Sequence, residues 1–188
     1  MVGTIPAGIL GILFQKQVQE LFIAPSYVAS FLVLNGVLLY VAELLRTKAK
    51  SGGGILDADE RIAAEVSWLQ STGVGVMQVL ALLPGFSRTG STIAGGLMVG
   101  LAHEDALRFS FLLATPIIAA AAALKLPMLF ASRDMPGIEA ALLGATCAAI
   151  ASYLSVKFLT RYFKTRTLTP FAVYCSLSGL IGLLLLSR

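Results

Sequence analysis

Long apolar runs separated by short polar segments make up most of the chain. A helix needs about 20 mostly apolar residues to cross a hydrocarbon core that is roughly 30 Å thick. Four runs meet that length, namely residues 21–42, 109–132, 140–160 and 167–187. Residues 1–14 are uncharged but shorter, and we expect them to be the end of a further membrane helix. The pattern therefore predicts an all-α polytopic membrane protein with about five transmembrane helices.

The region between the first and second of these long runs has a different pattern. Residues 66–87 carry no charge, are interrupted by glycines and end just after Pro84 and Gly85. After Arg88, the apolar run of residues 89–102 has about 14 residues, too few to cross the membrane. Two half-length helices that meet at a tip rich in proline and glycine predict a re-entrant hairpin, which we assign to residues 62–102.

The distribution of arginine and lysine agrees with a hairpin that returns to the side from which it started. In that layout one face of the membrane carries most of the basic residues: Arg46, Lys48, Lys50, Arg61, Arg108, Lys157, Arg161, Lys164 and Arg166. Because basic loops are enriched on the cytoplasmic side, residues 46–61 are predicted to be a polar cytoplasmic loop and the C-terminus to lie outside. Charge alone does not separate a re-entrant hairpin from two full spans.

Composition supports the membrane assignment. Apolar residues make up 57% of the chain and charged residues 13%, whereas soluble domains have roughly 45–50% and 25%. The net charge of +4 does not indicate nucleic-acid binding, because the basic residues lie in short loops between apolar runs. Cys147 and Cys175 stand in apolar runs without a CxxC spacing, so we expect both to be buried free thiols.

The segment PGFSRTGST, residues 84–92, places an arginine at the predicted membrane depth. Such an arginine costs about 2.5–3.5 kcal/mol on insertion scales and persists where it faces a counter-charge or a polar cavity. The nearest acids in the sequence, Glu65 and Glu104, lie well away from the hairpin tip. An anionic ligand is the natural counter-charge for Arg88. The alternative is an Arg88 side chain that reaches lipid headgroups from an interfacial loop.

The residues around Arg88 suit phosphate or diphosphate. Gly85 and Gly90 permit a backbone nest of N–H groups, and a helix that starts near Ser91 directs its N-terminal partial charge at the same place. Ser87, Thr89, Ser91 and Thr92 add hydroxyl groups. The guanidinium fork of Arg88 fits a phosphate through two parallel hydrogen bonds.

Two known phosphate motifs do not match this segment. The spacing from Gly85 to Gly90 resembles a Walker A loop, but Ser91 stands where the lysine is required and no strand precedes it. The type-2 phosphatidic acid phosphatases need a histidine a few residues after Ser-Arg, where this chain has Ala94.

Other polar residues are assigned structural roles. His103 is predicted to lie at a helix start in a loop or capping role, followed by Glu104 and Asp105 as first-turn acids that complement the helix dipole. We expect Gln78 to form a hydrogen bond between helices rather than to contact a ligand.

Residues 75–101, GVMQVLALLPGFSRTGSTIAGGLMVGL, resemble the signature of the undecaprenyl-diphosphate phosphatases, the bacitracin-resistance family. They match its Gly-x-x-Gln and Pro-Gly-x-Ser-Arg-x-Gly-x-Thr patterns. Three further segments also resemble the family, namely FSFLLATP (residues 109–116), TIPAGILGILF near the start and TPFAVY near the end. The resemblance implies hydrolysis of undecaprenyl diphosphate to undecaprenyl phosphate, which recycles the lipid carrier of peptidoglycan synthesis. It also implies an inverted repeat of two re-entrant hairpins, each followed by three spanning helices. Residues 1–45 would be the last two helices of the first repeat and residues 62–188 the whole second repeat.

By position, the resemblance makes Arg88, Ser87 and Thr92 catalytic or diphosphate-binding residues, with Ser87 either a phosphate ligand or the nucleophile. Gly85, Thr89, Gly90 and Ser91 would bind substrate. Thr89 stands where serine is usual, and Cys175 where arginine is common.

The first hairpin of the family, with Glu-x-x-x-Glu and Ser-Ser-Thr-Gly-His motifs, has no counterpart in this chain. We therefore expect a fragment or a misplaced start, no metal ligands in this chain, and upstream ligands for any divalent cation. The resemblance further implies a bacterial inner (cell) membrane location and a homodimer. A second hypothesis is an anion transporter or channel, because broken helices that point at a mid-membrane anion also serve transport. A non-catalytic scaffold would leave Arg88 unexplained.

Overall fold

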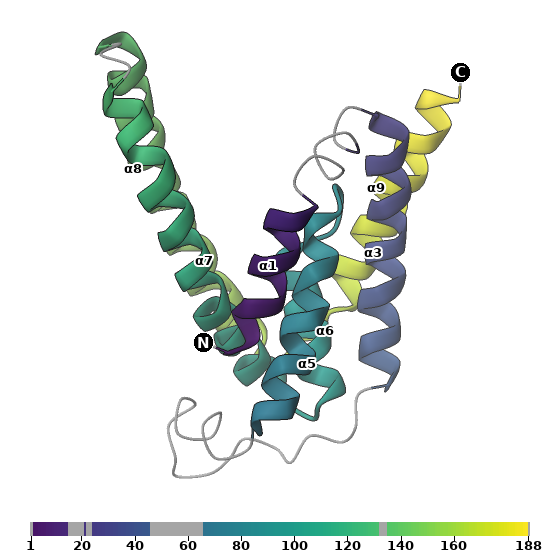
Figure 1. Ribbon diagram of the computed structural model, residues 1–188. Coiled ribbons are helices and arrows are strands. Elements are labelled where there is room, and N and C mark those ends of the chain that lie inside the picture. Colours follow the sequence, from purple (N-terminus) through teal and green to yellow (C-terminus); the bar gives the residue numbers. More distant parts are fainter. Residues whose placement is uncertain (1, 15–20, 22–23, 46–65, 132–134, 188) are drawn as a thin grey trace.

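A computed structural model describes residues 2–14, 21, 24–45, 66–131 and 135–187, and within them all regular structure is helical (Figure 1). The elements, in chain order, are the 3-10 helix η1 (Val2–Thr4), α1 (Ile5–Leu13), α3 (Pro25–Leu45), α5 (Trp68–Val79), the 3-10 helix η2 (Leu80–Leu82), α6 (Arg88–Met98), α7 (His103–Ala131), α8 (Met135–Tyr162) and α9 (Thr169–Leu186). The predicted all-α class is confirmed.

Four of these helices have the length and composition to cross a membrane: Pro25–Leu45, His103–Pro127, Gly137–Tyr162 and Thr169–Leu186. They correspond to the four long apolar runs of the sequence, and the chain is a multi-pass membrane protein. The N-terminal segment contributes α1, which has 9 residues. None of the apolar window of α8 is buried within the described chain, as expected of a helix whose surroundings are apolar.

Helices α3 and α9 lie side by side in opposite directions (Figure 1). Their close approach depends on small residues, because a Cβ atom on Gly36 would lie 2.7 Å from the carbonyl oxygen of Ala172. Gly179 has the same role in α9, where an added Cβ would lie 2.8 Å from the carbonyl oxygen of Ala29. Small residues let membrane helices gain van der Waals contact along their backbones.

Helices α5 and α6 form the short hairpin that the sequence predicts. They have 12 and 11 residues, so each is about 17 Å long at 1.5 Å per residue. Ser67 caps α5 in a capping box with Gln70. Between the helices, Gly85 has a φ of +99°, and an added Cβ would lie 3.0 Å from the backbone nitrogen of Leu32 in α3. Glycine is required here by both conformation and space.

The hairpin begins and ends near the C-terminal end of α3. Its tip is beside the midpoint of α3, because the backbone N–H of Ser87 bonds to Asn35. The chain then follows α6 toward the C-terminal end of α3, where His103 contacts Glu43. Since α5 runs antiparallel to α6, its first residues lie at that same end (Figure 1). This is the geometry of a re-entrant hairpin whose tip reaches the middle of a spanning helix.

The core is the contact of α6 with α3 and α7. Every residue of α6 from Gly90 to Leu97 is buried, and Gly96 lies so close to α7 that an added Cβ would be 2.8 Å from the Cβ of Ala106. Beyond this contact, α7 continues past Pro116 and forms with α8 a long helical pair that projects away from the other helices (Figure 1).

Both cysteines are free, but Cys147 is exposed on α8 and Cys175 is half-buried, so the expectation that both are buried is wrong. An apolar run predicts contact with something apolar, and over the apolar window of α8 the described chain does not supply a covering surface. The predicted loop 46–61 lies outside the described residues, and the division of the chain into 1–45, 46–61 and 62–188 stays a prediction.

Candidate functional site

The N-terminus of α6 is built by Ser87. Its Oγ accepts a hydrogen bond from the backbone N–H of Gly90 at 3.1 Å, so Ser87 is the N-cap of the helix. Its own backbone N–H donates to Oδ1 of Asn35 at 3.2 Å. The first N–H groups of a helix have no intrahelical acceptor, which leaves those of Arg88 and Thr89 available at this end. Free N–H groups at the N-terminus of a helix are the donors that anions use in proteins.

Asn35 fixes the position of this terminus from the middle of α3. It is fully buried, and besides accepting from Ser87 it donates through Nδ2 to the sulfur of Cys175 in α9 at 3.4 Å. One amide therefore connects three helices at the hairpin tip. Sequence analysis missed Asn35, although a lone amide in the apolar run VLNGVLL is the kind of residue that a membrane helix keeps for a specific partner.

Replacing Asn35 by leucine is expected to destabilise the fold by about 1 kcal/mol, because the part-buried hydrogen bond from the backbone N–H of Ser87 is lost. Melting in detergent measures this loss. Cys175→Ala is the control, since it removes only a weak sulfur acceptor and should change stability by less than about 0.5 kcal/mol. Equal melting of Asn35→Leu and the unmodified protein would show that Asn35 does not hold the hairpin tip.

Arg88 faces a cavity of about 200 Å³, which we call the arginine cavity. Its wall is formed by Ala7, Gly8, Gly11, Gln78, Ala81, Leu82, Arg88 and Ile117. The Arg88 side chain is exposed in this cavity, and no carboxylate of the described chain lies within salt-bridge distance of it. Arg88, which follows the residue that contacts the midpoint of α3, thus has no acidic partner within the described residues.

Ser87 and Thr89 face a different cavity, of about 210 Å³, which we call the serine cavity. Gly90 also lines it, together with apolar side chains of α3, α7, α8 and α9 and with Cys175. The structure therefore does not place Ser87 and Arg88 in one cavity. The reason is geometric, since consecutive residues of a helix point about 100° apart.

Thr92 and Ser91 lie beneath the first turn of α6 and line neither cavity. The hydroxyl of Thr92 donates to the carbonyl oxygens of Arg88 and Thr89 at 2.9 and 3.1 Å, and it is also in close contact with the hydroxyl of Ser110 in α7. Thr92 thereby holds the turn that carries Arg88 against α7. Ser91 is fully buried, and its Oγ has no hydrogen-bond partner within the described chain.

Gln78, in α5, lies in the wall of the arginine cavity and does not form the interhelical hydrogen bond that the sequence predicts. Neither Nε2 nor Oε1 has a partner among the described residues, although the side chain is only 2% exposed. An unpartnered buried amide costs about 1–3 kcal/mol. The expectation is wrong because a periodic pattern gives the face of a helix but not whether a partner lies opposite.

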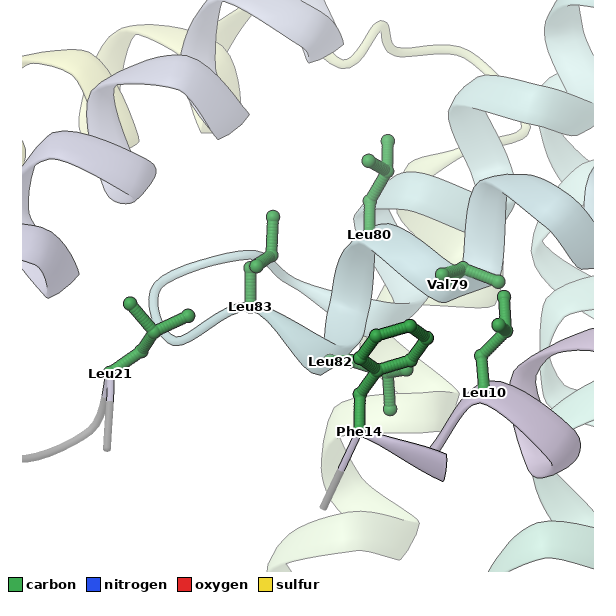
Figure 2. Close-up of a pocket in the computed structure, with 7 residues that line it drawn as sticks. All are labelled: Leu10, Phe14, Leu21, Val79, Leu80, Leu82 and Leu83. Atoms are coloured by element: carbon green, nitrogen blue, oxygen red, sulfur yellow. The ribbon is translucent and has the colours of Figure 1, made fainter. Parts of the chain in front are cut away.

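An apolar pocket of about 290 Å³ adjoins the arginine cavity, with which it shares Leu82. Figure 2 shows its lining side chains, which come from the α1 segment, from Leu21 and from the junction of α5 with η2: Leu10, Phe14, Leu21, Val79, Leu80, Leu82 and Leu83. All of them are hydrocarbon. A polar wall and an apolar wall therefore meet at Leu82, which suits an amphiphilic ligand.

His103 is not part of either cavity. It begins α7, as the sequence predicts, with Glu104 and Asp105 in the first turn. Its Nε2 lies 2.8 Å from Oε2 of Glu43, which also accepts from the backbone N–H of Leu168 at 3.1 Å. The ring stacks on Phe163. This cluster ties α3, α7 and the start of α9 together, and sequence analysis missed Glu43 because its partners are 60 and 125 residues away.

The described residues do not fit a metal site. No group of three or more His, Cys, Asp or Glu side chains in that part of the chain could hold a metal ion. The chemistry available here is that of a guanidinium, hydroxyl groups and helix N–H donors.

Comparison with known proteins relates this site to one family. The family model for bacitracin resistance protein BacA matches residues 1–181. An undecaprenyl-diphosphatase of Mycolicibacterium paratuberculosis is 44% identical over 191 residues, which cover 95% of this chain and 62% of the relative. An undecaprenyl-diphosphatase of Acidiphilium cryptum is 43% identical, covering 99% and 65%, and undecaprenyl-diphosphatase 2 of Burkholderia ambifaria is 44% identical, covering 97% and 63%.

The chain thus spans a little under two thirds of the length of these curated relatives. Residues 75–92, which carry the arginine and its flanking glycines, lie within the matched region. The extent of the match and the all-helical membrane fold lead to one conclusion: the chain belongs to the bacitracin resistance protein BacA family.

Proposed function

We propose that the protein hydrolyses undecaprenyl diphosphate to undecaprenyl phosphate and inorganic phosphate. This activity would recycle the lipid carrier of peptidoglycan synthesis and confer resistance to bacitracin. The proposal includes a bacterial inner membrane location and a homodimeric assembly. Membership of the BacA family and the activity for which the relatives are named support the reaction, and the site supports the class of substrate.

The observation that carries the proposal is the position of Arg88. Arg88 is the first residue of α6 and directly follows Ser87, which contacts the midpoint of α3, and its side chain has no carboxylate partner in the described chain. A cation in that place needs an anion from outside. The arginine cavity takes the charged headgroup, and the apolar pocket across Leu82 takes the first part of the hydrocarbon tail.

The reaction moves one phosphoryl group to water. The oxygen of water bonds to the terminal phosphorus, the bond from that phosphorus to the bridging oxygen breaks, and the bridging oxygen leaves with its electron pair on undecaprenyl phosphate. One proton of the water passes to solvent. Arg88 binds the phosphate oxygens on which negative charge builds up, and the N-terminus of α6 adds its dipole. Thr92 positions the turn that carries Arg88.

Ser87 has one of two roles, and each requires the diphosphate to reach the serine cavity as well as the arginine cavity. Either it directs its hydroxyl hydrogen at a phosphate oxygen while Oγ keeps its bond from Gly90, or its Oγ bonds to the terminal phosphorus. In the second case the hydroxyl proton passes to solvent, undecaprenyl phosphate leaves with the bridging oxygen, and water hydrolyses the phosphoserine to serine and inorganic phosphate. Gly85, Thr89 and Gly90 complete the proposed binding segment, and Ser91, which is buried and lines neither cavity, supports it from beneath. A divalent cation stays part of the proposal only as a group held outside the described residues, and no step above depends on it.

One pair of assays tests the proposal. The protein is produced from its own reading frame, with any adjoining upstream coding sequence, and placed in liposomes. Release of phosphate from undecaprenyl or farnesyl diphosphate is the expected result. Movement of an anion into the liposomes without hydrolysis would instead favour the transporter hypothesis.

A further inference from the structure

Among the described residues that line the arginine cavity, Gln78 is the one polar side chain besides Arg88. It projects from α5, whereas Arg88 projects from α6, so the two arms of the hairpin each supply one polar group to the same space. Gln78 is 2% exposed, and both atoms of its amide lack a hydrogen-bond partner in the described chain.

An amide in this state needs an explanation. Buried polar side chains are nearly always satisfied by protein or by ordered water, and exceptions occur where a ligand completes the site. A methionine would fill the same volume at no polar cost, so packing does not account for a glutamine here.

We propose that Gln78 is a headgroup-binding residue that acts together with Arg88. Its Nε2–H group donates to a phosphate oxygen of a bound diphosphate, and its Oε1 accepts from a hydroxyl group of the bound phosphate or from a water molecule beside it. The assignment rests on the proposed function and deepens it, because it names a residue that recognises the substrate headgroup.

The chemistry of a diphosphate explains why an amide accompanies the arginine. A guanidinium fork engages two oxygens of one phosphate, and a diphosphate has further oxygens that also leave water on binding. A neutral donor satisfies one of them without adding a second positive charge to an apolar site, where charge is expensive. The amide also supplies an acceptor, which arginine lacks.

Two substitutions of Gln78 test the assignment by binding. The probes are farnesyl methylenediphosphonate, whose bridging carbon prevents hydrolysis, and methylenediphosphonate without the lipid. Gln78→Met should raise the Kd of the lipid probe about 10-fold, because one charged-group hydrogen bond is lost. Gln78→Glu should raise it at least about 100-fold, because a carboxylate repels the anion. Binding of the probe without the lipid should be weakened by the same factors if the headgroup alone is recognised.

Gln70→Glu is the matched control. It makes the same chemical change in the same helix, but in the capping box, where glutamate replaces glutamine without loss. Its Kd should stay within twofold of that of the unmodified protein. The melting temperature without ligand supplies a second readout: Gln78→Met should melt at or above the temperature of the unmodified protein, whereas loss of a structural hydrogen bond would lower it.

The outcomes separate the two proposals. If Arg88→Met abolishes binding while both Gln78 variants bind as the unmodified protein does, the role of Gln78 is wrong and the proposed function stands. If Gln78→Met binds normally or melts lower, Gln78 is structural. If the unmodified protein binds neither probe, the proposed function and the role of Gln78 fall together.

Discussion

Phosphate release should fall by about 10³-fold when Arg88 is replaced by methionine. The methionine fills a similar volume but leaves the charge of the transition state without its guanidinium. The rate of Arg88→Lys should lie between those of the unmodified protein and Arg88→Met, because a lysine keeps the charge and loses the bidentate fork. The measurement is the rate of phosphate release from farnesyl diphosphate at saturating substrate, with the protein in the same detergent or lipid for every variant.

Arg161→Met is the matched control for this experiment. Arg161 is an exposed residue near the end of α8, so the same substitution there removes one positive charge without reaching either cavity. Its rate should stay within about twofold of that of the unmodified protein. A rate for Arg88→Met within threefold of the unmodified protein would rule out Arg88 as the residue that binds the reacting phosphate.

The second large effect is expected on stability. Replacing Glu43 by alanine should lower the free energy of unfolding by about 3 kcal/mol, because it removes the partner of a buried histidine and the acceptor of the Leu168 N–H group at once. Unfolding in detergent, followed by circular dichroism, measures the loss. Helices α3, α7 and α9 share this cluster, so the transition should stay cooperative while it moves to milder conditions.

Glu104→Ala provides the comparison for Glu43. Glu104 forms an ion pair with Lys164 at 3.8 Å, and the side chain of that lysine is 59% exposed. Exposed pairs of this kind contribute about 0–1 kcal/mol, so this variant should unfold close to the unmodified protein. If both alanine variants lost equal stability, burial of the Glu43–His103 contact would not be what stabilises the junction.

Much of the fold follows from apolar run length. The four spanning helices correspond to four apolar runs, and the two short helices correspond to the runs on each side of PGFSRTGST. These correspondences hold because the thickness of the membrane fixes the number of residues that a spanning helix needs. The turn at Gly85 also follows from sequence, since its positive φ and its contact with α3 both require glycine. Helix starts are less predictable, since α7 begins at His103, six residues before the apolar run 109–132 that predicts this helix.

The site is only partly readable from sequence. The sequence indicates Arg88 because an unpaired charge in an apolar run is conspicuous wherever its neighbours lie. It does not show that Ser87 and Arg88 face different cavities, since that depends on what packs on each side of α6. The contacts of Asn35 and Glu43 span 52 to 140 residues of sequence, and the state of Gln78 depends on the absence of a partner in the described chain. No local pattern encodes either.

The contact between Ser87 and Asn35 also has an electrical consequence. Because Asn35 is the midpoint of a spanning helix, an anionic headgroup that reaches the tip of the hairpin has crossed about half of the transmembrane voltage. Each unit of charge then changes in energy by about 1.2 kcal/mol per 100 mV, half of the value for a full crossing. With a negative interior, the voltage favours a headgroup that arrives from the inside and opposes one from the outside.

The sign of the change in turnover when a potential is imposed on liposomes therefore identifies the face from which substrate arrives. A turnover that does not depend on voltage would place the tip of the hairpin at a membrane surface.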